Sequence, residues 1–309
     1  MKLLAAIGAF LFSGIVWATP LHNIVVFGDS LSDNGNLYKF MKYQLPPSPP
    51  YFEGRFSNGP VWIEHLIASY FPENPNEHLL DYAYGGAGVS EEEGDDEVLF
   101  TLRREVKNYL LEHNDKASED SLFVIWIGSN NYLAFPEEVE KTLHDVHAGI
   151  VHSIQRLVEK GAKHILVVNL PDLGRTPAAI EFDSVDAMTY FAREHNDLLR
   201  KSIDDFRQEY PDVEWLYYDL HKAFEEVMTA PENYGFTNIT GTCVNSVVED
   251  ITKKSVLKMV TSVKPGINGD GCTGYLFFDL VHPTALAHKI LGDRAREMLD
   301  QAGIELTDR

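Results

Sequence analysis

Positive charge is scarce in this sequence. Its 26 lysines and arginines are outnumbered by 47 aspartates and glutamates, and the formal net charge over 309 residues is −21. A surface of this sign repels the phosphates of nucleic acids and of strongly anionic membranes. The composition therefore argues against a nucleic-acid partner and favours neutral or zwitterionic substrates.

Cysteine is scarce too, since Cys243 and Cys272 are the only two. Neither a CxxC nor an HExxH spacing occurs, so the sequence predicts no metal site. Two cysteines in an exported chain usually pair, because that compartment is oxidising. We expect a disulfide that closes the segment 243–272, with two free thiols as the alternative.

Long apolar runs are almost absent. The one exception, Leu3–Trp17, follows Lys2 at the start of the chain and is interrupted by Ser13 and Gly14. It is shorter than the ~20 residues of a bilayer span, and it fits a secretory signal peptide, residues 1–18, cleaved after Ala18. An uncleaved anchor is the alternative. We expect a secreted protein in which residues 19–309 form a single domain.

The remaining chain has no internal repeat and alternates two patterns. Short apolar runs typical of buried strands occur at 23–27, 79–82, 122–127, 165–168 and 213–218. Helical periodicity occurs at 139–157, where Gly161 ends it, at 188–206, and after Pro283, where we expect Leu286, Ile290, Leu291 and Met298 to face inward. This alternation predicts an α/β fold with helices on both faces of a parallel sheet.

Three segments lack these patterns. Tyr43–Asn58, rich in prolines, and 231–274, which contains both cysteines, are expected to be long loops. The acidic run Glu91–Glu97 is typical of a solvated surface loop, with calcium binding as the alternative.

A serine and a histidine occupy positions typical of catalytic residues. Ser30 follows the first strand in Gly28-Asp29-Ser30-Leu31, and ligands bind at the carboxyl ends of parallel strands. A serine nucleophile needs a base, and the base needs an acceptor that fixes its tautomer. Among the histidines, only His282 has an aspartate, Asp279, three positions before it. A simple turn at Ser30 and a helix cap at Asp279 are the alternatives.

An ester hydrolase also needs donors for the developing oxyanion. Gly85-Gly86 follows a predicted strand, where a backbone N–H is unobstructed by side chains. Asn130, in Gly128-Ser129-Asn130-Asn131, follows the strongest strand. All these positions are expected at one edge of the sheet, although glycine turns and asparagine caps are common.

Together these residues resemble the sequence blocks of the GDSL (SGNH) hydrolase family. The four blocks are Phe27–Asp33, Asp81–Ala87, Ile127–Asn131 and Asp279–His282. The resemblance covers most of the chain and implies a three-layer αβα sandwich with a mainly parallel five-stranded, flavodoxin-like sheet. It implies a Ser30, Asp279 and His282 triad, an oxyanion hole of Ser30, Gly86 and Asn130, and no metal or organic cofactor.

The sequence departs from the family pattern twice. Asp81 stands where the second block usually begins with asparagine, and Asn131 where the third usually ends in aspartate. Neither position supplies a catalytic group in the family, so the implied triad is unaffected. The local support of the oxyanion hole is left open.

Phe56–Trp62 and the cysteine-bearing segment further resemble a secreted bacterial lipolytic branch, which includes phospholipases, thermolabile haemolysins and glycerophospholipid:cholesterol acyltransferases. This implies cleavage of fatty-acyl esters in lysophospholipids or phospholipids, acyl transfer to an alcohol or sterol as a variant, and transient contact with a membrane surface. Aromatic residues downstream of Ser30 fit a wall for an acyl chain: Tyr38, Phe40, Tyr43, Tyr51 and Phe52.

Two other functions remain open at this stage. The same blocks serve carbohydrate and short-chain esterases, for which these aromatics would be a sugar platform. A non-catalytic secreted binding protein is the third reading, disfavoured by the intact set of site residues.

A regulatory hypothesis concerns the segment 243–272. It ends just before Asp279 and contains Lys253, Lys254, Lys258 and Lys264 in an acidic protein. We hypothesise that it covers the site and is relieved by an activating protease or by reduction, with a loop stapled for stability as the alternative. Unchanged activity after cleavage within it would contradict the hypothesis.

Overall fold

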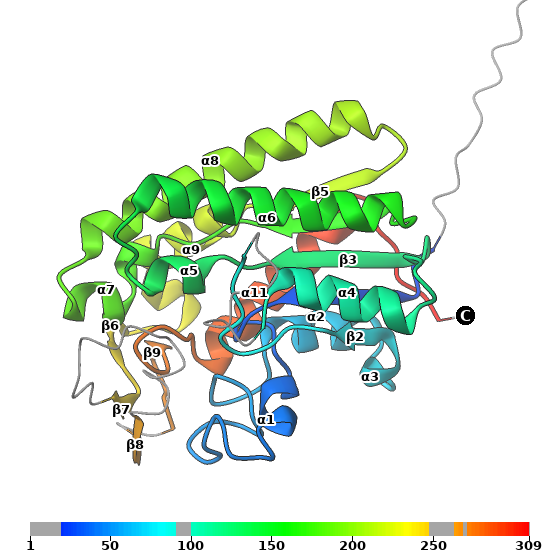
Figure 1. Ribbon diagram of the computed structural model, residues 1–309. Helices are drawn as coiled ribbons and strands as arrows, with labels where there is room; N and C mark the ends of the chain where they lie inside the picture. Colours follow the sequence, from blue (N-terminus) through cyan, green and yellow to red (C-terminus); the bar gives the residue numbers. More distant parts are fainter. Residues whose placement is uncertain (1–19, 91–99, 247–262, 268–270, 309) are drawn as a thin grey trace, which may run out of the picture.

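Five parallel strands form the central sheet (Figure 1). The computed structural model describes residues 20–90, 100–246, 263–267 and 271–308. The strands are β1 (Asn23–Gly28), β2 (Leu79–Asp81), β3 (Ser121–Trp126), β4 (His164–Val168) and β5 (Glu214–Tyr218), in the order β2-β1-β3-β4-β5. All neighbouring pairs are parallel. The predicted sheet is therefore confirmed, each strand lying within one or two residues of its predicted bounds.

Helices cover both faces of this sheet, which gives three layers (Figure 1). On one face, α6 (Val139–Glu159) packs between α4 (Leu102–Glu112) and α8 (Val185–Glu209). On the other, α2 (Trp62–Tyr70) packs along α11 (Ala285–Gln301). The strands need two apolar faces, and every residue of β3 is buried. The predicted α/β class and its αβα layering are confirmed.

The shorter elements lie mostly around the carboxyl ends of the strands. They are α1 (Asn36–Phe40), α3 (Pro75–His78), α5 (Ser129–Leu133), α7 (Pro177–Glu181), α9 (Leu220–Thr229), β6 (Asn238–Thr242), β7 (Val244–Ser246), β8 (Val263–Ile267), β9 (Tyr275–Phe277) and the 3₁₀ turns η1 (Leu173–Arg175) and η2 (Pro231–Tyr234). Within the described ranges, no helix combines the length and the apolar character of a bilayer span.

The segment 231–274 is not simply a loop, as we had expected. It contributes β6, which pairs in parallel with β9, and the antiparallel pair β7 and β8. These strands are three to five residues long and contain Asn, Gly, Thr and Pro, so they lack the alternation that reveals longer strands. The segment 43–58 contains no helix or strand, as predicted. Residues 1–18, 91–97 and 247–262, with their predicted roles, lie outside the described residues.

The inward face of α11 differs from the prediction at Leu286, whereas Ile290, Leu291 and Met298 are partly buried and pack against the core, as predicted. Leu286 is 40% exposed, and the buried positions are Ala287, His288, Gly292, Ala295 and Leu299. Small residues are needed here because α2 approaches closely. A Cβ atom on Gly292 would lie 2.7 Å from the carbonyl oxygen of Trp62 and 2.8 Å from the Cβ of His65. Leu286 precedes this small-residue stripe by one position, and therefore faces away from α2.

This contact generates a stability prediction. Replacing Gly292 with valine forces α11 away from the backbone of α2, and we expect the free energy of unfolding to fall by roughly 1–3 kcal/mol. Urea denaturation measures the change. The control is Lys289→Val on the exposed side of the same helix, expected to cost less than about 1 kcal/mol. Equal losses for the two variants would show that the close contact is unimportant.

Candidate active site

Ser30 lies in a tight turn directly after β1. The amides of Ser32 and Asp33 both donate to the carbonyl oxygen of Asp29, which closes the turn. The Leu31 amide donates to the Asp29 carboxylate at 3.0 Å. Ser30 is 4% exposed and lines a cavity. The first helix, α1, begins only at Asn36, so Ser30 is held by this turn and not by a helix start.

His282 joins Ser30 to Asp279 in a chain of short contacts. Its Nε2 lies 2.7 Å from the Ser30 Oγ, and its Nδ1 lies 2.7 and 2.9 Å from the two oxygens of Asp279. All three side chains are nearly inaccessible to solvent. Burial would raise the pKa of Asp279, but the charge of His282, its hydrogen bond and those of Tyr51 and the Val281 amide hold that pKa below its usual value. Asp279 is therefore ionised when the site is intact.

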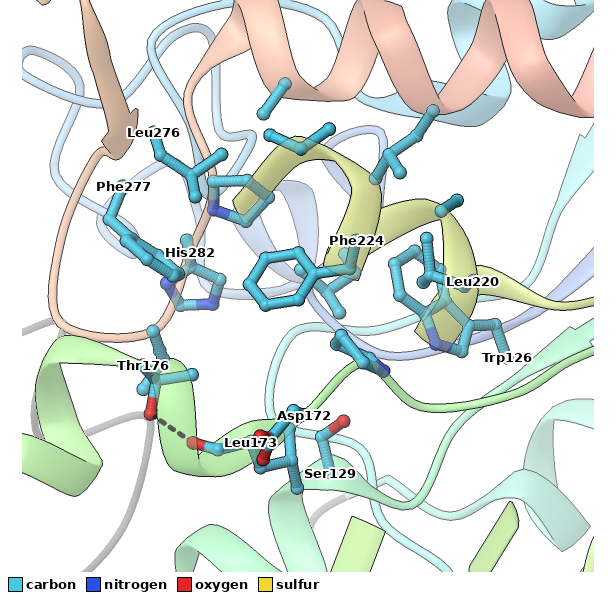
Figure 2. A pocket seen from close by; sticks show the side chains of 18 of the residues that line it. Trp126, Ser129, Asp172, Leu173, Thr176, Leu220, Phe224, Leu276, Phe277 and His282 are labelled. Carbon is cyan, nitrogen blue, oxygen red and sulfur yellow. Dashed lines mark hydrogen bonds between the residues drawn. The ribbon is translucent and has the colours of Figure 1, made fainter. Parts of the chain in front are cut away.

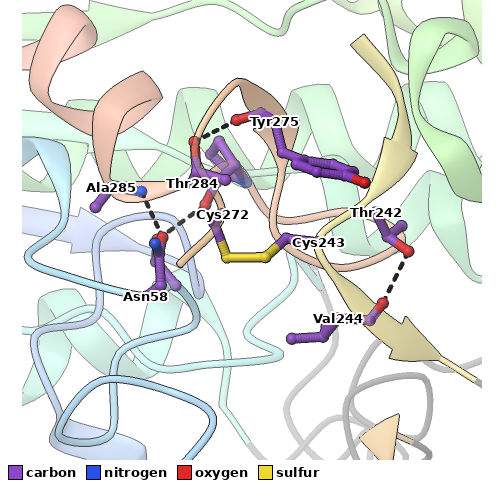
Figure 3. Close-up of a disulfide and its surroundings, with 10 residues drawn as sticks. Asn58, Thr242, Cys243, Val244, Cys272, Tyr275, Thr284 and Ala285 are labelled. Atoms are coloured by element: carbon purple, nitrogen blue, oxygen red, sulfur yellow. Dashed lines mark hydrogen bonds between the residues drawn. A yellow bond between two sulfur atoms is a disulfide. The ribbon is translucent and has the colours of Figure 1, made fainter. Parts of the chain in front are cut away.

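The Phe56–Trp62 block holds the His282 loop and the start of α11. The Phe56 ring lies 5.1 Å from that of His282, and the Ser57 hydroxyl donates to the carbonyl oxygen of Pro283 at 2.9 Å. The Asn58 side chain accepts from the Ala285 amide at 2.8 Å (Figure 3). The sequence resemblance marked this block without giving it a role. The structure shows that it fixes the backbone directly after His282, at Pro283 and Ala285.

The aromatics that we expected to form an acyl-chain wall do not line the cavity beside Ser30. Tyr51 is buried, and its hydroxyl donates to the Asp279 Oδ2 at 2.6 Å. Phe40, Tyr43 and Phe52 are exposed, and Tyr38 packs against Gly54 and Tyr43. The wall prediction was wrong because the proline-rich segment folds beneath the Asp279–His282 loop and away from the cavity.

Two backbone amides of the expected oxyanion hole, those of Ser30 and Gly86, are not engaged by any of the residues that the structure describes. Across the described part of the chain, neither the Ser30 amide nor the Gly86 amide has a hydrogen-bond acceptor. Gly86 has a φ of 78°, a conformation that favours glycine, in the turn after β2. Asn130, in the first turn of α5, lines the cavity with Ser30 and gives one side-chain proton to the Ala87 carbonyl oxygen at 2.7 Å. Its amide has a second proton to donate.

Asn131 and Asp81, the two departures from the family pattern, both hold the backbone near this site. The Asn131 amide accepts from the Val89 N–H at 2.9 Å and donates to the Val89 carbonyl at 2.8 Å. An aspartate cannot make the second bond when ionised. Asp81 accepts from the amides of Ala83 and Asn34. The support left open by the sequence is therefore present.

Three buried carboxyl groups and the partly exposed Asp81 surround the carboxyl end of β1. Asp33 accepts from the amides of Gly85 and Leu37, and Glu105 accepts from the Gly28 amide at 2.9 Å. Burial raises the pKa of Asp29 and of Asp33 to about 6. Burial likewise raises the pKa values of Asp81 and Glu105 well above their ordinary range. These carboxyl groups hold backbone amides in place, but removing the carboxyls from water costs free energy of folding.

The cavity beside Ser30 is apolar over most of its surface (Figure 2). It has an empty volume of about 920 Å³, part of it open to solvent. Phe224 and Leu220 of α9 enter it from one side and Leu276 and Phe277 of β9 from another, while His282 lies at its edge (Figure 2). Further apolar lining comes from Leu173, Ala223, Val227, Phe236, Ala287, Ile290 and Leu291.

Cys243 and Cys272 form the predicted disulfide (Figure 3). Both are buried in a cluster with Tyr51, Phe56 and Phe278. The amide of Cys243 donates to the carbonyl oxygen of Phe277 at 3.0 Å, just before the Asp279–His282 loop. The bridge therefore ties the segment 243–272 to the support of that loop.

With this geometry described, comparisons with known proteins identify the family. A model of the GDSL-like Lipase/Acylhydrolase family matches residues 24–295. The chain belongs to the GDSL lipase/acylhydrolase family. It is 32% identical to the phosphatidylcholine-sterol acyltransferase of Aeromonas hydrophila, covering 90% of each chain. It is 26% identical to the thermolabile hemolysin of Vibrio parahaemolyticus, covering 95% of this chain and 69% of the hemolysin.

Among solved structures, a catalytic mutant of the acetylxylan esterase Axe2 from Geobacillus stearothermophilus is similar at a TM-score of 0.49. The two share 17% sequence identity, with 94% of this chain and 98% of that chain covered. By its family, this GDSL protein is a lipolytic acylhydrolase.

The buried carboxyls generate a prediction about pH. Because the pKa values of Asp29 and Asp33 are near 6 in the folded protein and near 3.8 in the unfolded chain, the folded state binds more protons between these values. As pH falls from 7.5 to 5.5, these two groups therefore add about 0.8 kcal/mol each to the stability, whereas the buried His195 and His288, whose pKa values burial lowers to about 3, remove about 1.4 kcal/mol each. Urea denaturation of the wild type and of Asp29→Asn at both pH values isolates the carboxyl contribution, and we expect the variant to lack a gain of about 0.8 kcal/mol.

The net negative charge also favours acidification through relief of long-range repulsion. Repeating the measurement in about 0.5 M salt screens that effect and leaves the buried groups largely unscreened. A pH dependence in salt that is the same for Asp29→Asn as for the wild type would contradict the assignment to Asp29.

Proposed function

We propose that this protein is a secreted serine esterase that cleaves fatty-acyl esters of lysophospholipids and phospholipids. Ser30 is its nucleophile, His282 its general base and Asp279 the residue that orients His282. The observation that carries the proposal is the apolar cavity that begins at Ser30 and runs between α9, β9 and α11. A nucleophile at the mouth of such a cavity fits an ester whose acyl part is a hydrocarbon chain.

The proposed reaction has two halves. His282 takes the hydroxyl proton of Ser30 through the 2.7 Å contact, and the Ser30 Oγ attacks the acyl carbonyl carbon. His282 then protonates the departing alcohol as its bond to the acyl carbon breaks, which leaves the acyl group on Ser30. Water activated by His282 attacks this acyl-enzyme and releases the fatty acid.

The oxyanion of each tetrahedral intermediate needs donors that have no other partner. The free amides of Ser30 and Gly86 and the second Nδ2 proton of Asn130 support this role. Asp279, held ionised, stabilises the His282 imidazolium that forms when the proton is taken.

The cavity favours a lipid acyl chain over an acetyl group. An acetyl group reaches only the part of the apolar lining next to Ser30, whereas a fatty-acyl chain extends along α9, β9 and α11 and buries its methylene groups at about 0.8 kcal/mol each. A carbohydrate platform needs polar side chains for the sugar hydroxyls, and the lining is dominated by Leu, Ile, Val, Ala and Phe. The carbohydrate esterase is therefore the second candidate.

Acyl transfer is a possible extension of the same chemistry. An alcohol or a sterol that replaces water would take the acyl group from Ser30, and the similarity to the Aeromonas phosphatidylcholine-sterol acyltransferase supports testing this acceptor.

Export of the protein is supported by the disulfide between Cys243 and Cys272, because disulfides persist in oxidising compartments.

The first test compares the wild-type protein with Ser30→Ala. We expect Ser30-dependent release of fatty acid from lysophosphatidylcholine, with the rate reduced by about 10⁴-fold or more in the variant. Diacyl phosphatidylcholine and an acetylated sugar are the comparison substrates, and released acid is measured by mass spectrometry. Release of acetate alone would move the protein to the carbohydrate esterases. The absence of Ser30-dependent release from every ester would favour a non-catalytic binding protein.

A second prediction concerns chain length. Ala223 lines the cavity from α9, and Ala223→Phe fills the space that the distal part of a long chain would occupy. We expect kcat/KM for a long-chain p-nitrophenyl ester to fall by about 10- to 100-fold, and kcat/KM for the butyrate to change less than about threefold. Ala302→Phe, at an exposed position after α11, is the matched control. Equal losses on both esters would place the acyl chain elsewhere.

A further inference from the structure

The Tyr51 hydroxyl makes one contact with the proposed catalytic machinery. It donates to the Asp279 Oδ2 at 2.6 Å, across 228 positions of sequence. Oxygen-to-oxygen distances of 2.5–2.7 Å are typical of hydrogen bonds to an ionised carboxylate. We propose that Tyr51 is a positioning residue, which fixes Asp279 so that this carboxylate orients His282. The proposal deepens the function above and rests on its assignment of Ser30 and His282.

The two oxygens of Asp279 are held by different groups. Oδ1 accepts from the amides of Val281 and His282, at 2.9 and 2.8 Å. Oδ2 accepts from no backbone amide in the described structure, and its partners are the Tyr51 hydroxyl and the His282 Nδ1. Without Tyr51, the only partner left to Oδ2 is the imidazole that it has to orient, and the carboxylate is freer to rotate about its Cβ–Cγ bond.

The tyrosine itself is rigidly placed. It is 1% exposed and packs edge-on against Phe278 and Phe56, with ring centroids 5.1 and 6.1 Å away. The Ser48 hydroxyl donates to the Tyr51 carbonyl oxygen at 2.7 Å, and the Tyr51 amide donates to that of Pro47. The proline-rich segment therefore serves to present this hydroxyl to Asp279.

The hydroxyl remains a proton donor throughout catalysis. Burial, together with the negative charge of Asp279, raises the pKa of Tyr51 well above its ordinary value. The hydroxyl donates its proton to Asp279 without losing it, so it withdraws negative charge from the oxygen that His282 faces. Removing the hydroxyl should leave the carboxylate more basic towards His282 and less well oriented.

The variant Tyr51→Phe removes the hydroxyl and keeps the ring. We expect the rate at which a fluorophosphonate probe phosphonylates Ser30 to fall about 10- to 100-fold. We also expect the acidic limb of the rate–pH profile to move upward by about half a pH unit or more, because the imidazolium of His282 is better stabilised. Asp29 and His288, the other ionisable neighbours of His282, are unchanged in the variant, so the difference reports on Tyr51.

The decisive measurement is a double-mutant cycle with Asp279→Asn. If Tyr51 acts through Asp279, Tyr51→Phe adds little further loss, less than about twofold, in the Asp279→Asn protein. Equal proportional losses in the two backgrounds, or an unchanged rate and pH profile in Tyr51→Phe alone, would overturn the proposal. The cycle compares rates between variants, so it separates a role in positioning from a general loss of folded protein.

Tyr109→Phe is the matched control. Tyr109, a residue of α4, is equally buried at 1% exposed. Its hydroxyl accepts a hydrogen bond from the Ser118 amide. We expect its rate and pH profile to equal those of the wild type. Phosphonylation requires only an activated Ser30, so a wrong lipid assignment leaves this test intact. A wild-type Ser30 that the probe does not label would overturn the proposed triad and the Tyr51 role together.

Discussion

The structure depends on the contact between His282 and Ser30, two residues 252 positions apart that meet at 2.7 Å. The chain achieves this by placing β1 in the interior of the sheet and by fixing the start of α11 close to its carboxyl end. The Phe56–Trp62 block secures that position, because it bonds to the backbone of both Pro283 and Ala285. A displacement of the His282 loop by roughly 1 Å would lengthen its contact with Ser30 beyond hydrogen-bonding range.

The site is built at a cost in stability. Desolvated carboxyls such as Asp33 and Glu105 hold the turns that carry Ser30 and Gly86, although their burial raises their pKa values. Gly85 is equally constrained, since a Cβ there would lie 2.2 Å from the Phe56 ring. Strain and desolvation of this kind concentrate where a site must be rigid before its substrate arrives.

Local pattern was enough to predict the sheet, because each strand is a short apolar run and the helices between them have clear periodicity. It also led to Ser30, Asp279 and His282, whose residue types and spacing have few other chemical uses together. Contacts between residues far apart in the sequence could not be predicted where neither segment has a recognisable periodicity. Tyr51 belongs to a segment with no periodicity, so nothing in the sequence indicated that its hydroxyl reaches Asp279.

The same limit explains the remaining errors. Leu286 looks like a core residue by hydrophobicity, but α2 approaches α11 so closely that glycine is needed at position 292, and Leu286 lies on the exposed side of the helix. The exposed aromatics of the proline-rich segment looked like a substrate wall, whereas the cavity is built from α9, β9 and α11, whose residues are distant in sequence. In both cases, helix packing decides which apolar residues are buried, and single-residue hydrophobicity does not report it.

The central claim is that Ser30 is acylated during turnover, and mass spectrometry of protein quenched during hydrolysis of a long-chain p-nitrophenyl ester tests it directly. The account predicts a burst of p-nitrophenol and, on the peptide that contains Ser30, an added mass equal to the fatty acid minus water. A burst accompanied by an adduct on a different residue, or by no adduct at Ser30, would contradict it.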